Sequence, residues 1–137
     1  MKISTDKPPI WAEAHKHFKI DDAHTYYTYG DTLYNPARIP IPDHIVEHEE
    51  HHSRQQLALE GGPAAWWARY FVDADFRFQQ EAEAYGKQYR FACKHIKDRN
   101  AQARFLHEIA QHLSSGMYNA GRGLEEAKAQ IRKLSKI

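Results

Sequence analysis

The chain has 137 residues, of which 42% are hydrophobic and 27% charged, and its formal net charge is +1. This size and composition are typical of one globular domain, so we expect residues 1–137 to form a single domain. A nearly neutral chain has no overall electrostatic attraction to nucleic acid or acidic membranes. No apolar run approaches the roughly 18 residues that a membrane-spanning helix needs. The single cysteine excludes an internal disulfide.

The first 42 residues carry the clearest strand signal. Residues 1–10 lack the apolar segment of a secretory signal, which predicts a cytoplasmic protein. The stretch "IWAEAHKHFKI" (10–20) predicts a short amphipathic helix. In "HTYYTYGDTLYNP", Thr and Tyr residues flank Gly30-Asp31, which predicts a β-hairpin. The proline-rich "ARIPIP" predicts an extended connection.

The rest of the chain reads as helices. Asp43 is expected to cap a helix that runs to about residue 59 and stops at the Gly-Gly-Pro sequence 61–63. "AAWWARYF" predicts a short helix, and Asp73 caps a long one that ends near residue 97. Two further helices follow. The sequence therefore predicts a predominantly helical α+β domain with a small N-terminal β-hairpin or sheet and about four to five helices.

The segment "VEHEEHHSRQQ" (46–56) contains a metal-binding pattern inside the first long helix. His48 and His52 are four residues apart, which places both imidazoles on one helix face. Glu49 lies about 100° round the helix from His48. This is H-E-x-x-H, in which two histidines bind Zn²⁺ and the glutamate acts as general base. A zinc site of this kind needs a third protein ligand.

Helical phase separates two candidates for the third ligand. Glu81 borders the apolar stripe of its helix, four residues before Tyr85, whereas Glu83 shares its face with basic residues. We therefore expect Glu81 to point inward and Glu83 to point to water. A buried carboxylate requires a cationic partner, and a zinc ion would supply one. The alternative for Glu81 is a surface ion pair with Arg77.

The pattern H-E-x-x-H followed by "EAEAY" (81–85) resembles the Glu-zincin metallopeptidases. More closely, "GDTLYNP", "HEEHHSRQ", "WWARYFVDADFRFQQEAEAY" and "LSSGMYN" are similar to a group of small phage and prophage proteins described as metallopeptidases. The similarity spans residues 26 to about 131. It implies a minimal zincin-like domain in which His48, His52 and Glu81 bind Zn²⁺ and Glu49 is the general base.

Several aromatic residues are candidates for supporting roles. Tyr85 stands where the relatives often have Asp, and the resemblance implies that it hydrogen-bonds within the second shell of the site. Three other tyrosines are candidates to stabilise an oxyanion, with packing as the alternative: Tyr118, Tyr34 and Tyr70. Trp66 and Trp67 are expected in the core, with a substrate platform as the alternative.

The two middle positions of the motif depart from the family pattern. They are often apolar in such peptidases, because they pack the active-site helix into the core, but here they are Glu50 and His51. This indicates a helix that is less deeply buried and a site that is unusually open or polar, with His51 or His44 near it.

Three functions are compatible with these residues. The first is a zinc-dependent metallopeptidase-like hydrolase acting on a peptide or protein, with the edge of the hairpin aligning an extended substrate. The second is a non-catalytic, zinc-stabilised phage accessory or binding protein. The third is a di-iron carboxylate protein, prompted by Glu49-x-x-His52 and Glu108, although such proteins need two E-x-x-H helices.

A basic strip on the long helix predicts a solvated surface, with nucleic-acid contact as the alternative: Lys87, Arg90, Lys94 and Lys97.

Overall fold

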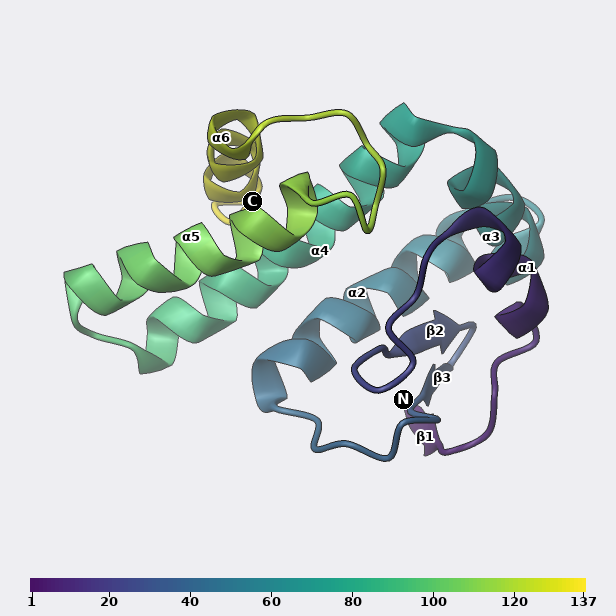
Figure 1. The fold of residues 1–137 in the computed structure, drawn as a ribbon. Coiled ribbons are helices and arrows are strands. Elements are labelled where there is room, and N and C mark those ends of the chain that lie inside the picture. The colour runs from purple at the N-terminus through teal and green to yellow at the C-terminus, as the bar shows by residue number, and fades with distance from the viewer.

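The computed structural model describes residues 1–137 as six helices and a small three-stranded sheet (Figure 1). In chain order the elements are β1 (Lys2–Ser4), α1 (Trp11–His17), β2 (Tyr27–Tyr29), β3 (Thr32–Tyr34), α2 (Asp43–Ala58), α3 (Gly62–Val72), α4 (Ala74–His95), α5 (Arg99–Ser114) and α6 (Leu124–Leu134). The predicted fold class, a predominantly helical α+β fold, is confirmed. None of the helices has both the length and the hydropathy needed to cross a membrane.

The predicted hairpin is formed by β2 and β3, which pair antiparallel with Thr28 opposite Leu33. Gly30 lies in the turn with φ +63°, a conformation that favours glycine. The sequence did not predict β1, which pairs in parallel with the other side of β3 and gives the strand order β1-β3-β2. Three residues carry too little pattern to predict a strand, so β1 is defined by its partner.

Helix α2 lies between the sheet and α4, while α5 and α6 pack against another side of α4 (Figure 1). The predicted apolar stripe of α4 contributes Phe78, Ala82 and Tyr85 to a core cluster with α5 and α6. Gly86 marks the close approach of α6, because a Cβ at this position would lie 3.1 Å from the backbone of Leu134. Helix α4 is therefore the element that joins the two halves of the molecule.

Of the two predicted helix N-caps, Asp43 and Asp73, only Asp73 is observed. The Asp73 carboxylate accepts a hydrogen bond from the Phe76 N–H at 3.0 Å and caps α4 as predicted. The predicted Asp43 cap is wrong: Pro42 occupies the cap position and Asp43 is the first residue of α2, with no side-chain cap. The proline ring fixes the backbone angle φ of the residue before the helix. The negative charge of Asp43 in the first turn interacts favourably with the positive end of the helix dipole.

Side chains of α2 cover the edge of β2 that faces them. The Gln56 side chain is fully buried; its Nε2 donates to the Thr28 carbonyl at 2.8 Å, and its Oε1 accepts from the Gly30 N–H at 2.7 Å. Ser53 Oγ donates to the Gly30 carbonyl at 2.6 Å. Trp67 Nε1 also donates to the Thr28 carbonyl, at 3.0 Å. These backbone groups are occupied, which leaves fewer of them for the predicted alignment of a peptide along this edge.

Replacing Gln56 tests how much this edge contact contributes. Gln56→Leu keeps the buried volume but leaves the Gly30 N–H without its acceptor, so we expect the free energy of unfolding to fall by about 1–3 kcal/mol. Urea denaturation measures it. Gln111→Leu, at an exposed position of α5, is the matched control and should change stability by less than about 0.5 kcal/mol. Equal stability of the two variants would contradict the expected role of Gln56.

Candidate metal centre

Three buried side chains from two helices meet at one point. His48 and His52 come from α2 and Glu81 from α4, and each is 5% exposed. The two Nε2 atoms are 3.1 Å apart, and each lies 3.1 Å from Oε1 of Glu81. The spacing of four residues aligns the histidines, and the packing of α2 on α4 brings the carboxylate to them.

These three atoms have the spacing of ligands around one metal ion. Ligands at about 2.0 Å from a tetrahedral ion lie about 3.3 Å apart. The three distances between these atoms, each 3.1 Å, are close to that value. His48, His52 and Glu81 form the only group of three or more His, Cys, Asp or Glu side chains with ligand atoms this near one another. They can hold one metal ion and leave a fourth position for water or substrate.

The expected open site is contradicted by this burial. Glu50 and His51 are half-buried, but they lie on other faces of α2, because each residue rotates the helix by about 100°. The face that carries His48 and His52 is covered by α4. His44 touches the site only indirectly, since its Nδ1 accepts a hydrogen bond from Gln88.

Each histidine donates its other ring N–H to a glutamine. His48 Nδ1 lies 2.9 Å from Gln88 Oε1, and His52 Nδ1 lies 2.8 Å from Gln55 Oε1. An amide oxygen only accepts hydrogen bonds, so both rings donate from Nδ1 and direct Nε2 at the metal position. Neither glutamine was expected from the sequence. The available signal was their phase, because Gln88 lies seven residues after Glu81 and Gln55 three after His52.

Glu81 is held by a tyrosine and not by an arginine. Tyr70 Oη donates to Glu81 Oε2 at 2.6 Å, which leaves Oε1 directed at the two imidazoles. The alternative ion pair with Arg77 is absent, because this buried guanidinium donates to backbone carbonyls of Tyr70, Tyr118 and Asn119. The predicted inward direction of Glu81 is therefore what the structure shows.

Glu83 does not simply point to water, in contrast to the prediction. Its Oε1 accepts from His51 Nε2 at 3.2 Å and from Gln55 Nε2 at 3.1 Å, because α2 packs along this side of α4. The contact fixes the amide that orients His52. His51 is therefore linked to His52 only through two other side chains, Glu83 and Gln55.

Glu49 is buried beside the three ligating residues, at 8% exposed. Thr28 Oγ1 on β2 donates to Glu49 Oε2 at 2.6 Å. The other carboxylate oxygen has no protein hydrogen bond, and Glu49 lines the same pocket as His48, His52 and Glu81. The strand therefore fixes one oxygen of this carboxylate and leaves the other available.

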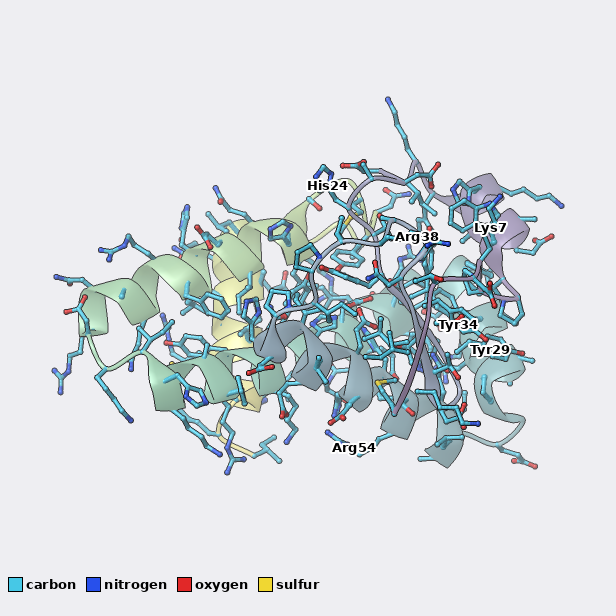
Figure 2. The ribbon with its side chains drawn as sticks, turned by 90° about the horizontal axis from the view of Figure 1, so that it is seen from below. Lys7, His24, Tyr29, Tyr34, Arg38 and Arg54 are labelled. Atoms are coloured by element: carbon cyan, nitrogen blue, oxygen red, sulfur yellow. The ribbon has the colours of Figure 1, made fainter.

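The candidate tyrosines lie in different places. The Tyr85 ring packs edge-on against His48, with ring centroids 4.4 Å apart, and its hydroxyl lies 2.6 Å from that of Tyr118. Tyr85 therefore packs against His48 but makes no hydrogen bond to His48, His52 or Glu81. The tyrosine that hydrogen-bonds to this group is Tyr70, through Glu81. Tyr118 lines the pocket beside the cluster. Tyr34 lies in β3 (Figure 2) and does not line that pocket, so no structural observation gives it an oxyanion role.

The buried charges shift one another's pKa. Burial lowers the pKa of His52, but the Glu81 carboxylate outweighs this effect and raises the pKa to about 9. Burial raises the pKa of Glu81, yet His52 and His48 hold it well below its usual range. Burial and the adjacent Glu81 both raise the pKa of Tyr70, so its phenol stays protonated and donates. Without a metal, a proton on His52 balances the Glu81 carboxylate.

A pocket of about 110 Å³ opens beside these residues. The segment that follows α1 passes in front of α2 and forms one wall (Figure 1). Other walls come from α3 and from the connection between α5 and α6, which carries Met117 and Tyr118. Trp66 and Trp67 are 1% and 8% exposed, so their predicted core position is confirmed, and they also line this pocket.

Other predicted features lie away from the cluster. Glu108 is exposed on α5 and is not part of the metal-binding group. In the basic strip, Lys87 Nζ and Arg90 Nη1 donate to the Ile137 carbonyl at 3.1 and 2.8 Å. Arg54 also projects from the exposed face of α2 (Figure 2). None of these residues faces the pocket.

Removal of the Glu81 carboxylate tests the third ligand. Losing one of three protein ligands should weaken metal binding by more than about 100-fold, since even an outer hydrogen-bond partner costs roughly 10–100-fold. Metal analysis of protein purified without metal-affinity steps should find about one ion per chain in the wild type and none in Glu81→Ala. Glu108→Ala, at an exposed position of α5 outside this group, is the matched control and should retain the ion. Equal metal content in wild type and Glu81→Ala would exclude Glu81 as a ligand.

The pKa shifts predict how pH affects the metal-free protein. The raised pKa of His52 stabilises the fold below its unfolded value of about 6.5, and this contribution is lost as the pH rises through about 9. The lowered pKa of Glu81 stabilises above about 4.3 and is lost on acidification. With EDTA present, urea denaturation should therefore show lower stability at about pH 9.5 than at about pH 6. In His52→Gln this difference should shrink; an unchanged difference would contradict the assignment.

No family model matches the chain, and no curated protein or solved structure matches it either. The resemblance to Glu-zincins therefore depends on the motifs in the sequence.

Proposed function

We propose that this protein is a zinc-dependent hydrolase of the metallopeptidase type, with zinc held by His48, His52 and Glu81. The observation that carries this proposal is the convergence of two imidazole nitrogens and one carboxylate oxygen at 3.1 Å, next to a buried Glu49. The motifs shared with Glu-zincin metallopeptidases, and with small phage and prophage proteins described as such, support it.

The donor set favours zinc and a catalytic use of it. Two histidines and one glutamate are the protein ligands of several zinc peptidases, in which the fourth position stays open. A zinc ion held here would supply the Lewis acidity that acidifies a water molecule and polarises a carbonyl group. The neutral glutamine partners keep both imidazoles oriented, so the site is organised before the metal binds.

Residues of this chain would carry out the proton transfers. Thr28 holds Oε2 of Glu49, so the free Oε1 is placed to accept a proton from the attacking water and to return it to the leaving amine. Tyr118 lines the pocket, and its neighbour Tyr85 can donate to its hydroxyl. The Tyr118 proton would then be available to hydrogen-bond the developing oxyanion. Burial raises the pKa of Tyr118, which keeps that proton in place.

A metal-stabilised binding protein without turnover is the second candidate. The observation that favours it is the burial of the ligating residues, at 5% exposed, together with the occupied edge of β2. The di-iron alternative has less support, because a single group of three ligating side chains serves one ion and Glu108 lies outside it. Metal analysis distinguishes the two kinds of site: a zinc site would contain one zinc ion per chain, and a di-iron site would contain two irons.

Glu49→Gln tests the catalytic proposal. The amide cannot accept the water's proton, so zinc-loaded Glu49→Gln should lose about 10²–10⁴-fold in kcat while retaining its zinc. The assay follows cleavage of a mixture of short peptides and acylated amides by mass spectrometry. Glu50→Gln is the control at the next position and should remain active. Full activity in Glu49→Gln would exclude Glu49 as the base, and an inactive zinc-loaded wild type would favour the binding protein.

A further inference from the structure

The walls of the pocket beside the cluster are mostly apolar. Ten of its 17 lining residues are hydrophobic. Four of them come from three different segments of the chain: Phe18, Ile20, Trp67 and Met117. At about 110 Å³ the pocket is somewhat smaller than an apolar cavity of roughly 150 Å³ that holds benzene in another protein. One phenyl or isobutyl group is the size of ligand group that such a space admits.

Outside the cluster itself, the pocket offers no cationic partner for an anion. No lysine or arginine lines it, and its carboxylates are Glu49 and Glu81. The nearby buried cation, Arg77, is already bound by three backbone carbonyls. A carboxylate in the apolar part of the pocket would lose its hydration and gain no counter-charge, which is costly. An uncharged group is therefore favoured over a free terminal carboxylate.

The sheet edge next to the site offers little backbone pairing to an extended peptide. The Thr28 carbonyl accepts from Gln56 and Trp67, and both backbone groups of Gly30 are bonded to Gln56 and Ser53. Recognition by strand addition requires these backbone groups to be free. The pocket and the metal centre are therefore the better-defined contacts for a substrate.

We propose that the pocket recognises one uncharged apolar group of phenyl or isobutyl size, attached next to the carbonyl of a small amide or of a short peptide end. This inference rests on the proposed function, since it places that carbonyl at the metal centre. It excludes long extended peptides bound along the sheet and substrates that carry a carboxylate into the pocket.

Three small probes test the pocket without relying on turnover. Benzamide, acetamide and benzoate are titrated into metal-free protein, so that benzoate cannot bind a metal, and indole N–H signals are followed by NMR. Trp66 and Trp67 line the pocket, whereas Trp11 does not and serves as an internal control. Because a phenyl group buries much more apolar area than a methyl group, benzamide should bind about 10-fold or more tightly than acetamide. It should also bind about 10-fold or more tightly than benzoate, which carries a buried charge.

Two variants and one longer ligand locate the binding. Met117→Ala removes part of the wall and should weaken benzamide binding about threefold or more; Val72→Ala, 77% exposed and outside the pocket, should not change it. Equal affinity for benzamide and benzoate, no effect of Met117→Ala, or tighter binding of a capped hexa-alanine peptide would overturn the inference. If benzamide binds but the zinc-loaded protein hydrolyses nothing, only the proposed function fails. If the protein hydrolyses peptides but benzamide does not bind, only this inference fails.

Discussion

The contacts of α2 with the sheet on one side and with α4 on the other are the interactions on which this structure depends. All the buried residues of α2 are polar: His48, Glu49, His52, Ser53 and Gln56. Buried polar groups destabilise a fold unless they are hydrogen-bonded. Here one set of them bonds to the sheet and the other to α4, so a helix with almost no apolar face is held in the centre of the molecule by hydrogen bonds.

This arrangement joins folding to the chemistry of the site. The carboxylate of Glu81 draws a proton onto His52 in the metal-free protein, and a divalent ion at the same point would replace that proton. Metal binding at this point and pH would therefore act on the same contact between α2 and α4. Tyr70, Gln55 and Gln88 hold His48, His52 and Glu81 in place, which would limit the rearrangement needed to bind an ion.

The same burial narrows what the site can accept. A zinc peptidase that binds extended chains needs a free strand edge and an open groove, whereas here α2 side chains occupy part of the β2 edge. What remains beside Glu49 is a small apolar pocket. If the cluster serves the proposed hydrolase, the shape around it would admit a small apolar substrate group.

The sequence by itself determined the features that depend on local spacing. Helical period placed His48 and His52 on one face and directed Glu81 inward, and turn chemistry predicted the hairpin at Gly30. Tertiary structure decided the rest. Strand β1 exists only because β3 pairs with it, and Glu83 is held by a helix about 30 residues away. The hydrogen-bond partners of His48, Glu81 and Glu49 come from three separate elements, α4, α3 and β2. Periodicity reports which way a side chain points along its own helix or strand, but which distant group it meets depends on how those elements pack.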